Sequence, residues 1–531
     1  MTTISSRFSA RLTETIETTL VGLVLFYAAL KFHHVHVGAG FPPHATPGAG
    51  IFGWTDQQRY LRAALAWAHG DLRLSEHWYL PGYVLLAAPF IYVTPSDPFL
   101  IPDLVSLLLT GWFTARLAVR LFPDLPYASL LGALAFTVTS VRSSDALLSW
   151  VEPWTSTPLA PLLLALMLAT LRLGDRVTPG RAALCGALWG LVVMVRPTEA
   201  LTAGLPAVLV CAAITLSAPV SVSARARVAT AGIGAALAVL AIVVVIHLAI
   251  FGFAPSEYMR QSFGTGFEWR ALGIKWVVLV LGTDTFHSAA GTGLAWRFWW
   301  ILPGFAGILA SLLATRAALR HLLVGGAVML HWAMYLCYRD LHVEGVWRYH
   351  NYHYFKWTFP ILGLYAVALV WMACRRHTDR HAFGAMAVVA LSACWHLEVS
   401  TLPLAEQTAH VIAPHRIDVL SGLRHPDRAL LIATDAPPAA SDDFMPIFMG
   451  PHHLEQGGRV WAYNGDFKAW PVPGGMAIAS LRPLPRGTAH LTLAPEAAIA
   501  PDRCLVLVRM RVVFGPQARE QPLSSLCHAT P

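Results

Sequence analysis

The sequence predicts a mainly α-helical, polytopic membrane protein with about eleven transmembrane helices, followed by a small α/β or β-rich C-terminal domain. Of the 531 residues, 56% are hydrophobic and only 13% are charged, whereas soluble domains carry about 25% charged residues. The mean hydropathy is +0.53. Apolar runs also recur at the length of about 20 residues that a helix needs to cross a membrane.

The apolar runs appear in a regular order along the chain. They lie near 17–36, 99–119, 126–142, 157–173, 181–195, 201–219, 229–252, 296–314, 321–338, 357–373 and 382–399. The fifth and sixth runs are only weakly separated. A further apolar stretch at 79–92 holds two prolines and is too short to span, so we expect a re-entrant or interfacial segment there.

Basic residues in short loops predict the orientation, because cytoplasmic loops are enriched in Lys and Arg. With the N-terminus inside, five successive loops with basic residues also fall inside. The inside residues are Arg7, Arg11, Arg116, Arg120, Arg172, Arg176, Arg225, Arg227, Arg316 and Arg320, with the run CRRHTDRH at 374–381. The outside then receives the connections 37–98, 143–156, 196–199, 253–295 and 339–356, and the tail from 400.

The chain therefore divides into a membrane domain, 1–399, with the extracytoplasmic loop 37–98, and an extracytoplasmic domain, 400–531. The sequence of the tail predicts short strands between turns rich in Pro and Gly. Cys504 and Cys527 lie in this tail, and whether they form a disulfide is left open. The other five cysteines lie in or beside apolar runs without metal-ligand spacing.

The first outside loop carries an amphipathic helix with an acid at its start. From Asp56 onward, apolar residues recur three and four positions apart, at Tyr60, Ala63, Ala64, Trp67 and Ala68. A helix with this pattern lies on a membrane surface. Two roles for Asp56 remain open from spacing alone: an N-cap of the helix, or a functional carboxylate at its positive end.

The strings WTDQQRYL and AHGDL, followed by WYLPGYVLLAAPF, resemble the first extracytoplasmic loop of the GT-C superfamily of membrane glycosyltransferases. That superfamily includes protein O-mannosyltransferases and bacterial lipid A aminoarabinose transferases. The resemblance implies transfer of a sugar from a polyprenyl-phosphate donor to a lipid, glycan or protein acceptor. It implies that Asp56 is the general base, with Tyr60 in the substrate site, and it does not cover the tail.

A second acid follows in the next outside loop, where Glu152 precedes Pro153. The aminoarabinose-type enzymes resemble this junction but have Asp where this chain has Glu. The resemblance implies a catalytic Glu152 that orients the acceptor or holds a metal, with Asp145 as the competing acid. No cofactor is certain, and a divalent metal remains open. A solvated acid beside a helix-starting proline is the alternative.

Many cations also face outside, against the usual bias, and a donor phosphate would give them a partner. The candidate substrate-binding residues are Tyr60, Arg59, Arg142, Arg196, Arg270, Lys275, Arg339, Arg348, His350, His353 and Lys356. Contacts with anionic lipid headgroups are the alternative for the cations. Arg196 can instead pair with Glu199 or with a loop carboxylate, and His247 and His331 are predicted to be polar packing residues within spans.

The function expected from these features is a glycosyltransferase acting at the outer face of a bacterial inner membrane. Inverting displacement at the anomeric carbon is the expected mechanism. A transporter or flippase of lipid-linked sugars is the alternative, but it predicts charges at mid-span, whereas these acids gather near the outer surface. The formal charge of +8 fits cytoplasmic loops, and no nucleic-acid motif or Gly-rich phosphate loop is evident.

Overall fold

The computed structural model describes residues 2–38, 50–281, 293–314, 318–338, 341, 346 and 350–375, with ten strands between 399 and 514. The chain forms two compact units. Unit 1 comprises Met1–Tyr258, Trp300–Trp332 and Tyr352–Leu391, and unit 2 comprises Met259–Trp299, Ala333–Asn351 and Ser392–Pro531.

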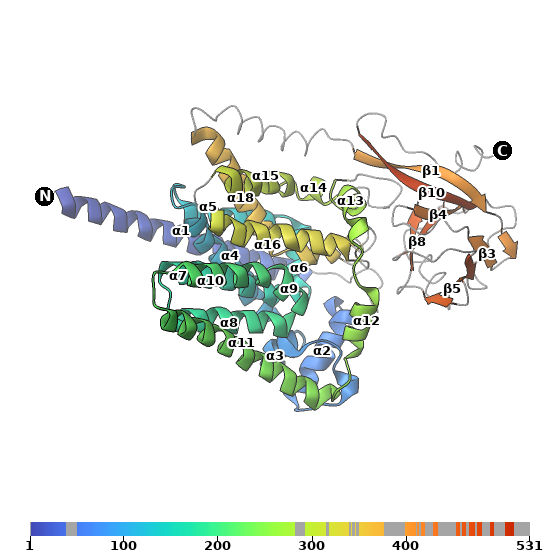
Figure 1. Ribbon diagram of the computed structural model, residues 1–531, viewed down its shortest axis with the longest axis horizontal. Helices are drawn as coiled ribbons and strands as arrows, with labels where there is room; N and C mark the ends of the chain where they lie inside the picture. The colour runs from blue at the N-terminus through green and yellow to red at the C-terminus, as the bar shows by residue number, and fades with distance from the viewer. Residues whose placement is uncertain are drawn as a thin grey trace. The chain divides into compact units, whose positions relative to one another are not determined.

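Unit 1 is a bundle of apolar helices. Within the described residues, five stretches are long and apolar enough to cross a membrane: Thr15–Gly38 in α1 (Thr2–Gly38), Leu100–Leu121 (α4), Ser156–Asp175 (α7), Pro197–Ser217 (α9, Pro197–Thr202, and α10, Gly204–Ser217) and Val222–Phe251 (α11). Figure 1 shows α7, α8, α10 and α11 side by side. The chain is an integral, multi-pass membrane protein.

Further apolar helices account for most of the other predicted spans. These are α5 (Ala128–Phe136) with η4 (Thr137–Arg142), α8 (Pro179–Val195), α15 (Ile301–Ala314), α16 (Ala318–Cys337) and α18 (Thr358–Arg375). The fifth and sixth predicted spans are separate helices, α8 and α9–α10. The stretch near 79–92 forms two short helices, α3 (Pro81–Ala87) and η3 (Ala88–Tyr92). The eleventh predicted span lies outside the described residues except at Val399, which starts a strand.

Glycines allow two pairs of helices to approach closely. A Cβ at Gly186 of α8 would clash with the Gly232 carbonyl oxygen of α11. A Cβ at Gly307 of α15 would clash with the Tyr365 carbonyl oxygen of α18. Small residues at such crossings let helix backbones pack tightly in a membrane, where hydrophobicity alone does not drive helices together.

Unit 2 contains short helices and the strands of the tail. The helices are the later part of α12 (Glu257–Thr265), η5 (Trp269–Ala271), α13 (Leu272–Lys275), η6 (Trp276–Leu281) and α14 (Leu294–Arg297). The strands are β1 (Val399–Ala409), β2 (Val411–Ala413), β3 (Arg416–Val419), β4 (Arg428–Ala433), β5 (His453–Gln456), β6 (Arg459–Ala462), β7 (Phe467–Val472), β8 (Gly475–Ser480), β9 (Ala489–Thr492) and β10 (Leu505–Phe514). They pair in two antiparallel five-stranded sheets, ordered β1-β10-β4-β8-β7 and β2-β3-β9-β5-β6. Cys504 and Cys527 lie outside the described residues.

Candidate active site

The predicted amphipathic helix of the first loop is α2, Thr55–Ala68. Its apolar face buries Tyr60, Ala63 and Ala64 against a cluster that includes Tyr83 and Val84 of α3. The three- and four-residue spacing places these side chains on one stripe of the helix. The stripe fixes which way α2 is turned, and with it the position of every polar residue on the helix.

Asp56 lies in the first turn of α2 but is not its N-cap. The N-cap is Trp54, which has an extended backbone and whose side chain makes no capping hydrogen bond. The Asp56 side chain is half-buried, and its Oδ1 accepts a hydrogen bond of 2.5 Å from the Tyr79 hydroxyl. The carboxylate is therefore engaged with another segment of the same loop.

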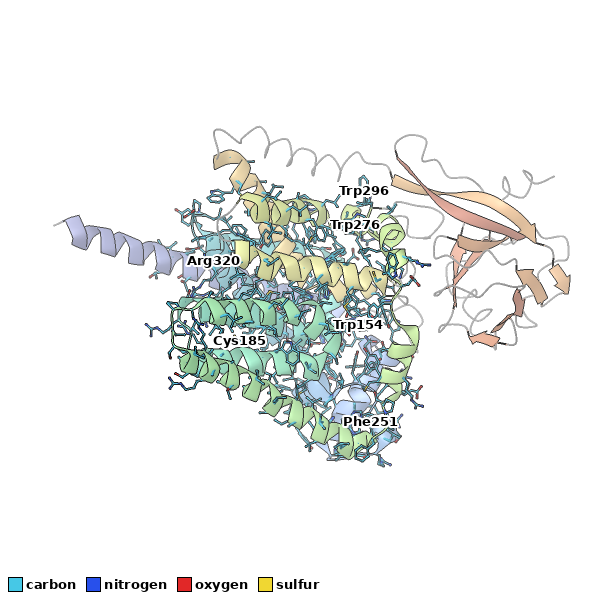
Figure 2. All side chains as sticks on the ribbon, viewed as in Figure 1. Trp154, Cys185, Phe251, Trp276, Trp296 and Arg320 are labelled. Carbon is cyan, nitrogen blue, oxygen red and sulfur yellow. The ribbon has the colours of Figure 1, made fainter. Side chains whose placement is uncertain are left out.

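The turn after α6 (Ser144–Val151) lies directly against α2. Gln57 is fully buried, and its Nε2 donates a hydrogen bond of 3.1 Å to the Pro153 carbonyl oxygen. The Trp54 ring lies 6.1 Å from the Trp154 ring. Trp154, labelled in Figure 2, is itself buried in unit 1. Trp54 and Gln57, at the start of α2, thus hold the segment that carries Glu152, the second predicted acid.

Glu152 occupies the C-terminal end of α6 and is only 3% exposed. Its Oε2 accepts a hydrogen bond of 3.3 Å from the Trp154 indole nitrogen. The competing Asp145 lies at the opposite end of α6, in the first turn, and is half-buried. Because Gln57 is next to Asp56 and Pro153 is next to Glu152, the Gln57–Pro153 hydrogen bond joins the immediate neighbours of both predicted catalytic acids.

Arg196 reaches the same region from the junction between α8 and α9. Pro197 starts α9, and Arg196 has an extended backbone between the two helices. Its side chain is buried, pairs with Glu199 at 3.2 Å and lies 5.0 Å from the Tyr354 ring. The predicted pairing of Arg196 with Glu199 is confirmed.

Groups from separate segments of the chain affect the pKa of Tyr60. Burial raises the pKa of the Tyr60 hydroxyl well above its usual value, and the nearby Asp56 and Tyr258 raise it further. Arg196 and a hydrogen bond with Thr155 act in the opposite direction. Tyr60 therefore lies within electrostatic reach of Asp56 and Arg196, two of the predicted site residues, and contacts the turn that follows Glu152.

Lys356 lies in the segment just before α18 and also contacts this region. It is fully buried, and its Nζ donates hydrogen bonds of 2.7 Å to the Ser149 carbonyl oxygen and 2.6 Å to Thr157 Oγ1. Burial lowers the pKa of Lys356 to about 7, opposed by the charges of Asp103 and Glu152 and aided by Arg196. The lysine thus contacts the chain on both sides of Glu152.

His353 belongs to the same region and lies in the short helix η7, Asn351–Phe355. It is 2% exposed, its ring stacks on Trp154 with centroids 3.9 Å apart, and its Nδ1 lies 2.9 Å from Ser156 Oγ. His331, by contrast, bonds to Thr202 and to the Tyr354 carbonyl oxygen inside the bundle, as expected of a packing residue.

The remaining predicted residues are not brought into this region by the described contacts. The Arg59 guanidinium lies 3.6 Å from the centre of the Trp78 ring, and Arg142 is exposed at the end of η4. Arg270, Lys275 and His350 belong to unit 2, where Lys275 Nζ donates a hydrogen bond to the Tyr338 carbonyl oxygen. Arg339 and Arg348 lie outside the described residues.

The structure adds four polar residues that sequence reasoning did not select: Gln57, Tyr79, Asp103 and Tyr258. Asp103 is 1% exposed, and both its oxygens accept hydrogen bonds from the Tyr83 hydroxyl, at 3.0 and 2.8 Å. An acid four residues into an apolar run was the signal for Asp103. Tyr79 belongs to the WYLPGY string of the first loop. No sequence pattern predicts its contact with Asp56.

The described part of the chain contains no cluster of side chains arranged as metal ligands. Among those residues, no group of three or more His, Cys, Asp or Glu side chains is arranged to hold an ion. A divalent metal held by Asp56 or Glu152 would therefore need further ligands from the substrate or from other parts of the chain.

No protein-family model and no curated protein matches the sequence. Among solved structures, the chain is similar to ArnT from Cupriavidus metallidurans bound to undecaprenyl phosphate, at 13% identity and a TM-score of 0.45, over 71% of this chain and 69% of that one. An oligosaccharyltransferase from Archaeoglobus fulgidus in complex with Zn and sulfate has 14% identity and a TM-score of 0.35, over 70% and 52% of the two chains. The arabinosyltransferase EmbB from Mycobacterium smegmatis has 13% identity and a TM-score of 0.32, over 94% and 66%.

All three are membrane glycosyltransferases of the GT-C superfamily, the family that the loop motifs resemble.

Proposed function

We propose that this protein is a membrane glycosyltransferase of GT-C type, which moves a sugar from a polyprenyl-phosphate donor to an acceptor on the extracytoplasmic face. One observation supports this most: the contact of α2 with the turn after α6, which holds Asp56 and Glu152 on adjoining segments. Two acids, a buried arginine and several tyrosines at the end of an apolar bundle suit a polar reaction on a lipid-borne substrate.

Asp56 is the general base in this proposal. Its carboxylate takes the proton of the acceptor hydroxyl or amine as that atom attacks the anomeric carbon. The new bond to the anomeric carbon forms while the bond to the donor phosphate oxygen breaks, and its electron pair leaves on the polyprenyl phosphate. Attack opposite the leaving group inverts the anomeric centre. General-base assistance of this kind contributes about 10²–10⁴-fold to the rate.

Glu152 acts as the second acid and orients the acceptor. It is buried, and the Trp154 indole holds one of its oxygens. A carboxylate fixed in this way can accept a hydrogen bond from a second substrate hydroxyl and so select the attacking group. The half-buried Asp145 at the far end of α6 is the weaker candidate for that role.

Arg196 is the cation best placed to stabilise charge on the departing phosphate. It shares the surroundings of Tyr60 with Asp56, and a guanidinium can contact two phosphate oxygens at once. Further candidate contacts to the donor phosphate or sugar are Arg59, Arg142, Arg270, Lys275, Arg339, Arg348, His350 and His353.

The test is sugar transfer by purified protein in lipid nanodiscs. The probes are undecaprenyl phosphates carrying radiolabelled mannose, arabinose or aminoarabinose, mixed with envelope lipids as acceptors. We expect transfer with at least one donor, and a rate about 10²–10⁴-fold lower in Asp56→Asn, because the amide cannot accept the proton.

Asp71→Asn is the matched control. Asp71 belongs to the same loop, but its carboxylate pairs with Arg73 on the loop surface. We expect its rate to stay within about twofold of wild type, as is usual for a surface residue. An Asp56→Asn variant with the wild-type rate would remove Asp56 as the base. Translocation of an intact lipid-linked sugar, with no transfer from any donor, would favour the flippase.

A further inference from the structure

The Tyr79 hydroxyl donates a hydrogen bond to the proposed base. Tyr79 lies between η2 (Leu74–Glu76) and α3, and its hydroxyl donates to Asp56 Oδ1 at 2.5 Å. Its ring lies 4.5 Å from the Tyr60 ring and 4.8 Å from the Tyr258 ring, measured between centroids. Two neighbouring rings thus fix the position of the hydroxyl independently of the hydrogen bond.

The protonation state of Tyr79 suits a permanent donor. Burial raises the pKa of its hydroxyl well above the usual value, and the charge of Asp56 raises it further. The phenol therefore keeps its proton at neutral pH. A hydrogen bond donated to a carboxylate favours the ionised form of that carboxylate.

We propose that Tyr79 is a positioning residue for Asp56, holding one carboxylate oxygen in place and favouring the ionised form that accepts the proton. This inference rests on the proposed function for the identity of the acceptor, but not for the contact itself. No sequence pattern assigned Tyr79 a role.

The charged and titratable groups described around α2 stay in place when the Tyr79 hydroxyl is removed. Asp56, Tyr258 and Arg196 all affect the pKa of Tyr60, and Tyr60, Tyr258 and Arg196 remain in every variant used below. Two cations of α2 are directed elsewhere: Arg59 lies over the Trp78 ring, and Arg62 pairs with Glu76. Removing the Tyr79 hydroxyl should therefore change the titration of Asp56 while the surrounding charges stay the same.

The test measures the titration of Asp56 directly, without any sugar transfer. A hydrophobic carbodiimide modifies carboxyl groups in their protonated form, and mass spectrometry of the purified protein quantifies modification of Asp56 at each pH. In Tyr79→Phe, which keeps the ring but removes the hydroxyl, we expect the pH of half-maximal modification to rise by about one unit.

Tyr92→Phe is the matched control. The Tyr92 hydroxyl also bonds to α2, but at the opposite end, where it donates to the Ala68 carbonyl oxygen at 2.8 Å. We expect the titration of Asp56 in this variant to coincide with that of wild type. Coincident curves for Tyr79→Phe and wild type would overturn the proposal.

Transfer assays separate this inference from the proposed function. If both hold, the acidic limb of the pH profile of kcat/KM moves upward in Tyr79→Phe by the same amount as the modification curve. A purely structural loss would lower the rate at every pH without moving that limb, and so would count against positioning. A shifted modification curve in a protein that transfers no sugar would defeat the proposed function alone.

Discussion

Burial distinguishes residues that look alike in the sequence. Lys356 and Arg59 are both cations of predicted outside segments, yet Arg59 is half-exposed over Trp78 and Lys356 has no exposed surface. The Lys356 ammonium bonds to Ser149 and Thr157, which precede and follow Glu152 in the chain. Lys356 is thus placed to support the Glu152 segment, and a role in binding the donor would require it to become accessible.

The first prediction concerns the pH dependence of Lys356→Met. Burial lowers the pKa of Lys356 from 10.5 to about 7. Between these values the unfolded chain binds a proton that the folded protein lacks, so folding becomes more favourable as the pH rises, by up to about 1.4 kcal/mol per pH unit. Wild type should therefore gain thermal stability from about pH 7 to about pH 9, relative to Lys356→Met.

Melting midpoints in detergent, measured for both proteins across that range, check this. The difference between the two midpoints matters, because every other titrating group is common to both proteins. Parallel curves would mean that Lys356 is solvated or charged in the folded state.

At the scale of the helix, local patterns were predictable and long-range contacts were not. The apolar spacing from Tyr60 onward was enough to predict α2, because amphipathic periodicity depends on neighbours three and four residues apart. The contact of Gln57 with Pro153 joins residues 96 positions apart, and no local pattern encodes it. The hydrogen bond from Tyr79 to Asp56 likewise joins residues 23 positions apart.

The second prediction concerns the packing of α3 against α8. A Cβ at Gly82 would lie 2.8 Å from the Met194 carbonyl oxygen and 2.8 Å from Val195 Cγ2, so the helices would have to separate. Because Val195 precedes Arg196, Gly82→Ala should lower both the melting midpoint and the transfer rate. We expect a loss of stability of about 1–3 kcal/mol, typical of overpacking.

Gly234→Ala is the control for that substitution. Gly234 lies in α11, and a Cβ added there would have no atom within 4 Å, so alanine meets open space. Alanine also favours helix more than glycine does. An unchanged or slightly higher midpoint is expected here, and an equal loss in both variants would show that the α3–α8 approach is not tight.

For the whole molecule, composition and the length of apolar runs were enough to predict a multi-pass membrane protein. The described helices α4, α7 and α11 fall close to the predicted spans, because a run of about 20 apolar residues has few other stable states. The count of eleven spans stays a prediction, since the last span lies outside the described residues. Which loop residues meet could not be predicted, because several loops are expected at the same face of the membrane and only tertiary contacts select among them.

The third prediction concerns sidedness, which depends on the positive-inside bias alone. In a cysteine-free background, Arg73→Cys in the first loop should react with a membrane-impermeant maleimide added to intact cells. Arg227→Cys, near the start of α11, should react only after the membrane is permeabilised. Both positions are exposed, so access to the reagent depends on the side of the membrane. The reverse pattern of labelling would place Asp56 in the cytosol.

The contact between α2 and the 153–155 turn has a consequence for protein engineering. The partners of Trp54, Gln57 and Tyr60 lie on a segment that is distant in the sequence, so the first loop is not an independent module. A chimera that exchanges residues 50–92 for those of another protein would leave three mismatched partners beside Glu152. Grafting a new specificity onto this scaffold therefore requires both loops to be exchanged as one cassette.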